Sequence, residues 1–348
     1  DIENAKSSIH LSYFIIRNDQ IGKQLIDLLS KKAKEGIEVR LLYDKFGSRI
    51  RTKKMFAPLI KEGGQVIEFF PTKLFFRPHH NNRNHRKIVV IDGETCYLGG
   101  ANIGEEYISR NERIRPWRDT HLKIKGSAVH IVQTQFFLDF LFVSKEHVDF
   151  DDKNIMNKYF PSFKKTYNNK IQVISSGPDY RQSVIRDAYL KIINSAHKEI
   201  IIQSPYFIPD ESLLSAILIS VKSGVSVKIM LPGVPDKKMV YYASMSFIEE
   251  LLEAGVEVYL YRGFLHSKVV MSDGEVVSIG SANFDIRSFD INFETNAIVY
   301  NKNFYQENLN VFNNDVKNSK KLSYSEYCKR SFKQKTLEQI FRLLSPLL

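Results

Sequence analysis

The sequence predicts an α/β protein made of two similar halves, and two observations carry this prediction. A motif of the form His-x-Lys-x-x-x-x-Asp occurs twice, and both copies are related by one offset of 181 residues (266 − 85, 268 − 87, 273 − 92). The motif residues are His85, Lys87 and Asp92 in the first copy and His266, Lys268 and Asp273 in the second. Each copy is also preceded by a strand, a helix and a strand, in that order. This order predicts βαβ units with parallel strands and right-handed crossovers.

The first half begins with a β-branched and aromatic run over residues 9–16, which predicts a buried strand. Residues 20–35 have apolar side chains at helical spacing and are followed by Gly36, so we expect a helix that stops there. Residues 39–43 predict the next strand. A further helix before Gly64 leads to a strand over residues 66–70.

The second half repeats this plan. We expect a strand over residues 200–203, a helix over residues 211–222 and a strand over residues 227–231. A further helix before Gly255 then leads to a strand over residues 256–260. The repetition supports duplication of a whole βαβ-containing unit rather than of a short motif.

The two halves differ by an insertion before the first motif. Gly64 lies 21 residues before His85 (85 − 64), whereas Gly255 lies 11 residues before His266 (266 − 255). The extra stretch, Pro71–Arg83, is aromatic and basic, which is compatible with a substrate-facing flap and equally with a solvated insertion. The predicted boundaries are 1–145 for the first half, 146–170 for a connector, 171–300 for the second half and 301–348 for a basic, amphipathic C-terminal segment.

Composition narrows the class of partner. The net charge of +11 indicates an anionic partner, such as nucleic acid, an acidic membrane surface or a phosphorylated substrate. The two cysteines, Cys96 and Cys328, are far apart, which argues against a disulfide framework or a structural zinc site and for a reducing compartment. No run approaches the roughly 18–20 apolar residues of a membrane span. The chain begins with Asp1, so we expect a fragment or processed form of a longer protein.

Each motif is predicted to start a strand that turns back on itself. Residues 88–91 and 269–271 are apolar and β-branched, and alternation along a strand puts the histidine and the lysine of a motif on one face. An Asp-Gly pair follows in each half, which is typical of a tight hairpin turn. The returning strands, near residues 96–98 and 276–279, would bring Asn102 and Asn283 back beside the histidines.

These residue types suit displacement at a phosphodiester. One histidine can attack phosphorus while the other protonates the departing oxygen. The lysines and asparagines can stabilise the charge of the transition state, so the chemistry implies neither a metal ion nor another cofactor. The duplication therefore suggests two half-sites that act on one anion.

Four carboxylates accompany the motifs. A histidine that transfers protons is usually oriented by a carboxylate on its other nitrogen, and Asp119 and Glu294 lie in equivalent strands after each motif. Asp92 and Asp273 are candidate catalytic residues by their place in the motif. Their position in a turn favours a different role, in which they bind backbone amides and support the site without touching phosphorus.

At this point the sequence resembles the phospholipase D superfamily, whose mark is two His-x-Lys-x(4)-Asp motifs forming one site. The resemblance to bacterial cardiolipin synthases covers the chain from its start to its end. It is carried by the segments 35–44, 117–121, 204–210 and 343–348. It implies two phospholipase D-like α/β/α sandwiches packed around one shared active site, and two hydrophobic helices ahead of this region.

The resemblance also implies a reaction and a location. Two molecules of phosphatidylglycerol would give cardiolipin and glycerol through a phosphohistidine, with His85 as the nucleophile and His266 as the acid. The expected partners are phosphatidylglycerol and an anionic membrane surface rather than nucleic acid, at the bacterial cell membrane. The alternatives are a hydrolytic phospholipase D or another phosphatidyltransferase, then an endonuclease of the superfamily or a non-catalytic membrane-binding module.

The C-terminal segment has a composition that suits a membrane surface. Residues 301–348 contain nine Lys or Arg and four Asp or Glu, a net charge of +5 (9 − 4). Leu337, Ile340, Phe341, Leu344 and Leu348 recur at helical spacing. This pattern predicts a helix that either lies in the interface of an anionic bilayer or docks on the core of the protein.

Overall fold

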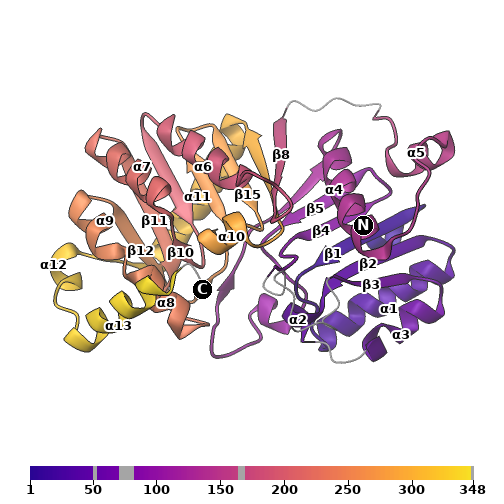
Figure 1. Ribbon diagram of the computed structural model, residues 1–348, viewed down its shortest axis with the longest axis horizontal. Helices are drawn as coiled ribbons and strands as arrows, with labels where there is room; N and C mark the ends of the chain where they lie inside the picture. Colours follow the sequence, from indigo (N-terminus) through magenta and orange to yellow (C-terminus); the bar gives the residue numbers. More distant parts are fainter. Residues whose placement is uncertain (50–52, 70–81, 164–168, 346–348) are drawn as a thin grey trace. The chain divides into compact units, whose positions relative to one another are not determined.

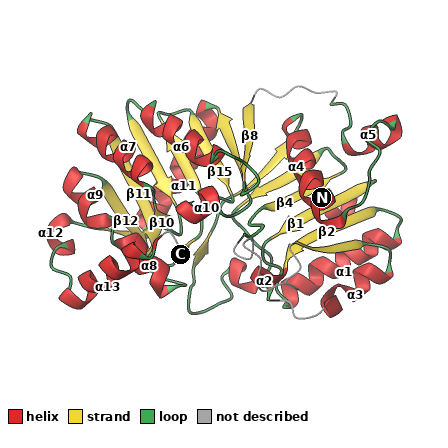
Figure 2. Ribbon diagram, in the orientation of Figure 1, coloured by secondary structure: helices red, strands yellow, loops and turns green. Residues whose placement is uncertain are grey.

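The computed structural model describes residues 1–49, 53–69, 82–163 and 169–345. The chain forms two compact units. The first unit comprises Asp1–Ile108 and His121–Asn168, and the second comprises Ser109–Thr120 and Asn169–Leu348. Figure 1 traces both along the chain, and Figure 2 shows strands flanked by helices in each.

The first unit contains one mixed sheet of six strands in the order β3-β2-β1-β4-β5-β7. Strands β1, β2 and β3 are parallel, whereas β4, β5 and β7 run antiparallel to their neighbours. The strands are β1 (Ser8–Tyr13), β2 (Glu38–Asp44), β3 (Gln65–Phe69), β4 (Lys87–Ile91), β5 (Thr95–Gly99) and β7 (His121–Lys125). The helices are α1 (Gln20–Lys34), α2 (Lys45–Ser48), α3 (Ala57–Lys61), α4 (Ala128–Ser144) and α5 (Lys153–Tyr159).

Alternation along β1 sets the two layers of helices in the first unit. Ile9 and Leu11 are fully buried in the core that also contains Ile26 and Leu29 of α1. His10, between them in sequence, points to the opposite face, where its ring stacks on Phe136 of α4 at 4.8 Å. Helices therefore cover both faces of this sheet, as the predicted α/β/α arrangement requires.

The second unit contains a larger sheet in the order β18-β12-β11-β9-β14-β15-β17-β8. Its long strands are β8 (Lys170–Ser176), β9 (Glu199–Gln203), β11 (Ser226–Pro232), β12 (Glu257–Tyr261), β14 (Val269–Ser272), β15 (Val276–Gly280), β17 (Glu294–Tyr300) and β18 (Ser319–Lys321). Its helices are α6 (Val184–Asn194), α7 (Glu211–Lys222), α8 (Lys238–Met245), α9 (Ile248–Ala254), α10 (Ile286–Asp290), α11 (Lys302–Lys317), α12 (Tyr324–Tyr327) and α13 (Phe332–Leu343). Short strands β6 (Trp117–Arg118) and β13 (Phe264–Leu265) pair with each other, as do β10 (Phe207–Ile208) and β16 (Phe284–Asp285).

The predicted elements recur in both units with shifts of one to three residues at their ends. The helix predicted over residues 211–222 is α7, Glu211–Lys222, and the one predicted over residues 20–35 is α1. Both Asp-Gly turns have the positive φ angles of a two-residue hairpin, 55° and 65° at Asp92 and Gly93 and 52° and 82° at Asp273 and Gly274. The prediction of two hairpins built on the motif strands is confirmed.

The boundaries of the halves differ from the sequence-based ones in one informative place. Residues 109–120 fall within the first half by sequence but belong to the second unit, because β6 pairs in parallel with β13. The predicted connector, residues 146–170, contains α5, whose Tyr159 hydroxyl donates to Glu38 at 2.8 Å, so most of it belongs to the first unit. Sequence periodicity alone does not show either long-range pairing.

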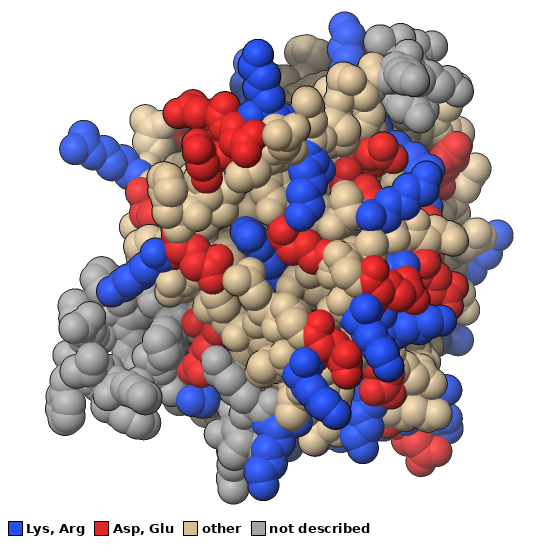
Figure 3. Space-filling model, turned by 90° about the vertical axis from the view of Figure 1, so that its right-hand side faces the viewer, with Lys and Arg blue, Asp and Glu red and all other residues tan. Residues whose placement is uncertain are grey.

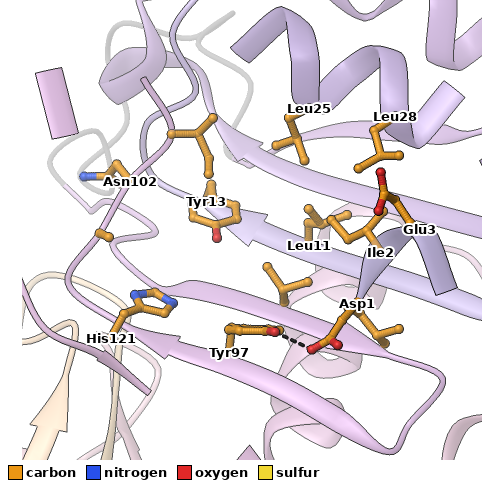
Figure 4. Close-up of a pocket in the computed structure, with 14 residues that line it drawn as sticks. Asp1, Ile2, Glu3, Leu11, Tyr13, Leu25, Leu28, Tyr97, Asn102 and His121 are labelled. Carbon is orange, nitrogen blue, oxygen red and sulfur yellow. Dashed lines mark hydrogen bonds between the residues drawn. The ribbon is translucent and has the colours of Figure 1, made fainter. Parts of the chain in front are cut away.

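A cavity of about 410 Å³ opens on the α1 side of the first sheet (Figure 4). Leu25 and Leu28 of α1 and Val89 and Ile91 of β4 line it. In the second unit, α6 contacts α7 and β14, which are the counterparts of α1 and β4. The cavity therefore marks the position that α6 takes in the other half of the duplication.

Two further predictions concern the insertion before the first motif and the presence of membrane spans. The insertion predicted at Pro71–Arg83 lies mostly outside the described residues, including its Phe75, Phe76, Arg77, His79 and His80. Arg83 is described, and its guanidinium lies 4.4 Å from the centroid of the Phe46 ring. Of the helices in the described chain, none has both the length and the apolar content required to cross a membrane.

Candidate active site

The first half-site lies at the start of β4. His85 lies two residues before the first residue of this strand and is partly buried, and its ring contacts that of Phe14 edge-on at 4.9 Å. Lys87 is fully buried, and its Nζ donates to the His85 carbonyl oxygen at 2.5 Å. This bond fixes the lysine ammonium beside the backbone of the histidine, as period-two alternation predicts for one face of a strand.

The residue between them anchors the strand on its opposite face. Arg86 has no exposed surface, and its Nη1 donates to both carboxylate oxygens of Asp139 on α4, at 2.6 and 2.7 Å. The two short bonds pair the buried charge of the arginine with that of the carboxylate. Removing either residue would leave the other as an unpaired buried charge. The motif strand is therefore held from behind while His85 and Lys87 face the other way.

Asn102 follows β5 and is nearly buried. Its Oδ1 accepts a hydrogen bond from the Ile15 backbone N–H at 3.2 Å. In Figure 4 the side-chain nitrogen of Asn102 points away from the apolar cavity, beyond Tyr13. Tyr107 also forms a side-chain hydrogen bond with Asn102, so the backbone of Ile15 and the side chain of Tyr107 together fix the orientation of this amide.

The second half-site repeats this geometry at the start of β14. Lys268 is 1% exposed, and its Nζ donates to the His266 carbonyl oxygen at 2.7 Å. Burial lowers the pKa of Lys268 to about 8, against the raising effect of Asp119, Glu294 and other carboxylates nearby. A buried lysine whose pKa is shifted this far is typical of functional sites.

A carboxylate orients the second histidine. Nδ1 of His266 lies 2.6 Å from Oδ2 of Asp119. Burial raises the pKa of the Asp119 carboxyl, but His266 and Lys268 outweigh this effect and hold it below its ordinary value. The ring of His266 also packs against that of Trp117, with centroids 4.8 Å apart. An ionised, buried carboxylate on Nδ1 sets the tautomer of the imidazole and leaves proton transfer to Nε2.

The strand pairing of β6 with β13 explains how Asp119 reaches this histidine. The His266 backbone N–H donates to the Arg118 carbonyl oxygen at 2.7 Å. Arg118 is itself fixed by an ion pair with Asp315 of α11, at 3.0 Å, and donates to Ser267 at 3.2 Å. The sequence identified Asp119 as a candidate carboxylate for orienting a histidine. It did not indicate the contacts of Arg118 with His266, Ser267 and Asp315.

Glu294 is the first residue of β17 and is fully buried. It accepts a hydrogen bond from the Ser281 hydroxyl at 2.5 Å, and it raises the pKa of Lys268. Asn283 is also buried, and its side chain bonds to Asp285, whose pKa is raised by burial. The structure therefore places Glu294 and Asn283 in the acidic surroundings of the second motif.

Asp92 and Asp273 lie at the other end of the motif strands from the histidines. Asp92 accepts hydrogen bonds from the backbone N–H groups of Lys6, Ser7 and Ser8, at 2.7 to 3.1 Å. Asp273 accepts the equivalent bonds from residues 197–199, at 2.7 to 3.1 Å. Each carboxylate lies seven positions after its histidine (92 − 85, 273 − 266), roughly 23 Å for an extended segment at about 3.3 Å per residue.

These two carboxylates therefore hold the ends of the motif strands to neighbouring backbone. Each joins the end of a motif strand to the backbone that leads into the neighbouring strand, β1 or β9. These bonds agree with the predicted role in which the two carboxylates bind backbone amides, and their assignment as catalytic residues stays a prediction.

Comparisons with known proteins agree on the family. The model of the family described as "Cardiolipin synthase, PLD-like domain" matches residues 1–118 and 189–316. The chain is 45% identical to the "Major cardiolipin synthase ClsA" of Bacillus subtilis (strain 168), over all of this chain and 72% of that protein. It is 48% identical to "Cardiolipin synthase 2" of Staphylococcus epidermidis, over all of this chain and 71% of that protein.

Solved structures show a similar fold. Phosphatidylserine synthase from Haemophilus influenzae Rd KW20 superposes with a TM-score of 0.74 at 18% identity, over all of this chain and 91% of that chain. Polyphosphate kinase from Porphyromonas gingivalis superposes with a TM-score of 0.60 at 13% identity, over 99% of this chain and 50% of that chain. At these identities the likeness concerns the fold alone.

Proposed function

This chain belongs to the family of cardiolipin synthases with a phospholipase D-like domain, and we propose that it transfers a phosphatidyl group between two phosphatidylglycerol molecules. The products are cardiolipin and glycerol. The observation that carries the proposal within the site is the bond between His266 and Asp119, because it prepares one histidine for proton transfer.

In the first step, a ring nitrogen of His85 attacks the phosphorus of one phosphatidylglycerol. A nitrogen–phosphorus bond forms, the bond from phosphorus to the glycerol oxygen breaks, and His266 gives the departing oxygen a proton. The first phosphatidyl group is then held as a phosphohistidine on His85.

In the second step, His266 takes a proton from the headgroup hydroxyl of another phosphatidylglycerol. The resulting oxygen attacks phosphorus, the nitrogen–phosphorus bond breaks, and cardiolipin leaves. The proton gained by His266 restores its starting state, so the cycle balances.

The remaining site residues have supporting roles in this proposal. Lys87 and Lys268 bring buried positive charge to the phosphate oxygens, and Asn102 and Asn283 supply amide groups. Asp119 orients His266, and we assign Glu294 to the orientation of His85 by its place in the duplication. The reaction needs no metal in this scheme, because the lysines stabilise the charge.

The proposed setting is the surface of an anionic bacterial membrane. An alternative is binding to nucleic acid, which the net charge of +11 also suits. On the side of the first unit shown in Figure 3, Lys and Arg alternate with Asp and Glu among the described residues. A nucleic-acid site would favour a basic stripe, which the described residues on this face do not form. The lipid substrate is proposed because the chain belongs to the cardiolipin synthase family.

The test is the product formed from pure phosphatidylglycerol, identified by mass spectrometry. We expect cardiolipin and glycerol in equal amounts. Phosphatidic acid as the main product would mean that water is the acceptor and the chain is a hydrolase. No product from any phospholipid would overturn the catalytic proposal.

A further inference from the structure

Helix α13 exposes an apolar face. The side chains of Phe332 and Leu343 are 85% and 84% exposed, and those of Ile340 and Leu344 are 47% and 37% exposed. Their spacing puts them along one side of a helix. We call these four residues the outer face of α13. Large apolar side chains grouped in this way are a feature of interaction surfaces.

The inner side of α13 docks on α8 and α9 through charged groups. Glu338 has no exposed surface and accepts from Nε of Arg330 at 2.8 Å, and Arg330 also donates to Glu249 at 2.6 Å. Arg342 donates to Glu250 at 2.9 Å. These directional bonds fix the rotation of the helix about its axis, so the four residues of the outer face point away from α8 and α9.

An aromatic contact between α13 and α8 agrees with this orientation of the helix. Phe341 stacks on Tyr242 of α8, with centroids 6.0 Å apart and planes at 10°. Figure 1 shows α13 running beside α8 at the edge of the second unit. Of the apolar residues predicted to line one face of this helix, Phe341 is therefore turned inward, whereas Ile340 and Leu344 are turned outward.

The exposed charges on α13 itself are basic. Within the described part of α13, Glu338 is the one acidic residue, and it is buried. Lys329 and Lys333 are exposed at the start of the helix, and Lys237 and Lys238 are exposed at the start of α8. An exposed apolar strip edged by lysines matches the interface of an anionic bilayer, where apolar groups enter below the headgroups and ammonium groups meet phosphates.

This surface borders the second half-site. Asp236, one residue before Lys237, accepts from the Tyr206 hydroxyl at 2.6 Å. The same carboxylate is close enough to Lys268 to raise its pKa. Lipid held at the start of α8 would therefore lie close to the motif lysine of this unit.

We propose that the outer face of α13, together with Lys237, Lys238, Lys329 and Lys333, docks this chain on an anionic phospholipid bilayer. The inference deepens the proposed function, on which it rests for the identity of the lipid substrate. Docking through this face brings the second half-site to the membrane that holds the substrate.

The test is co-sedimentation with vesicles of phosphatidylcholine, with and without phosphatidylglycerol. The test variant combines Phe332→Ser and Leu343→Ser, and both side chains are so exposed that the fold should keep its Tm. The matched control combines Ile219→Ser on α7 and Val311→Ser on α11, which replaces exposed apolar residues elsewhere in the same unit.

We expect the test variant to partition onto phosphatidylglycerol vesicles at least tenfold more weakly than the native chain, and the control to match the native chain. Lys329→Glu combined with Lys333→Glu should weaken binding at low salt and have less effect at high salt. Equal partitioning of the test variant and the native chain would overturn the proposal. So would sedimentation equilibrium showing that the native chain is a dimer that the test variant breaks, because the occupant would then be a second copy.

Activity separates this inference from the proposed function. On a short-chain phosphatidylglycerol dissolved as monomers, the test variant should produce cardiolipin at the native rate, while its rate on vesicles falls with its binding. If no chain forms cardiolipin but the native chain still binds vesicles through α13, the docking surface stands and the proposed reaction fails.

Discussion

Asp119 and His266 lie 147 residues apart in the sequence and form a hydrogen bond of 2.6 Å within the second unit. The carboxylate comes from the stretch that follows the first motif, yet it orients the histidine of the second motif. The parallel pairing of β6 with β13 makes this possible, because it carries residues 109–120 into the second unit. The histidine of the second motif is therefore oriented by a carboxylate that precedes it by most of the length of one half.

Replacing Asp119 with Asn should test this dependence. The amide retains the shape but does not stabilise an imidazolium, so we expect kcat to fall by about 100- to 10,000-fold with little change in KM. The measurement is the rate of cardiolipin formation. Ser267→Ala is a suitable control because it removes a neighbouring bond to Arg118, and it should change kcat by only a few-fold. A native rate for Asp119→Asn would show that proton transfer does not depend on this carboxylate.

The covalent intermediate should form on His85. In a His266→Ala variant, a phosphatidyl ester with a p-nitrophenol leaving group needs no proton from the enzyme, so attack by His85 can proceed while the second step stalls. We expect a burst of p-nitrophenol close to one equivalent and a phosphatidyl adduct on His85 by peptide mapping. An adduct found on His266 in the native chain would reverse the assignment of the two histidines.

Activity should decline at alkaline pH as Lys268 loses its proton. Burial lowers the pKa of this lysine to about 8, so the ammonium is present below that pH and is lost as pH rises through it. We expect kcat/KM to fall above about pH 8, since this ratio reports ionisation of the free enzyme. Lys268→Arg retains a charge throughout this range, so its alkaline limb should move to higher pH whatever its maximal rate. An unchanged limb would assign the ionisation to another group.

The sequence predicted most of the architecture because the duplication repeats its signals. The motif strands, their hairpins and the preceding βαβ units follow from periodicity and from Asp-Gly turns, and these depend on neighbours in the chain. Side chains alternate between the two faces of a strand, which places Lys87 and Lys268 on the same face as the histidines of their motifs. The sequence therefore predicts which residues share a face, and the two lysine bonds to histidine carbonyls agree.

The contacts that complete the second half-site could not be predicted in the same way. The ion pair of Arg118 with Asp315 joins residues 197 positions apart, and nothing in the local pattern of α11 marks Asp315 as inward-facing. The burial of Glu338 on α13 could not be predicted for a similar reason. The charge of this carboxylate is paired with Arg330, and this pairing depends on tertiary packing. Amphipathic spacing alone therefore predicted the helix but not the side that docks.

Removing the turn carboxylates should lower stability rather than catalysis. Asp273→Asn weakens three hydrogen bonds to the backbone of residues 197–199, and we expect a loss of about 1–2 kcal/mol in the free energy of unfolding. The fraction that remains folded should turn over at a rate close to the native one. Denaturant unfolding and kcat measured at low temperature separate the two effects.

The pH dependence gives a second check on this role. Burial alone would raise the pKa of Asp273, but the backbone N–H groups outweigh it and lower the pKa. A lowered carboxyl pKa contributes stability above the unfolded value, and that contribution is lost as pH falls through the folded value. The native chain and Asp273→Asn should therefore differ less in stability in acid than at neutral pH. A variant that keeps its stability but loses kcat would restore a catalytic role.

Chelation should leave the chemical step largely intact. In the proposed site Lys87 and Lys268 supply the positive charge that a divalent ion would otherwise bring to the phosphate oxygens. We expect the rate of cardiolipin formation from monomeric short-chain phosphatidylglycerol to be unchanged within about twofold after dialysis against EDTA. The monomeric substrate matters, because divalent cations also bind anionic bilayers and alter access to them. Complete loss of turnover that returns with one particular metal ion would place that ion in the mechanism and remove the lysines from this role.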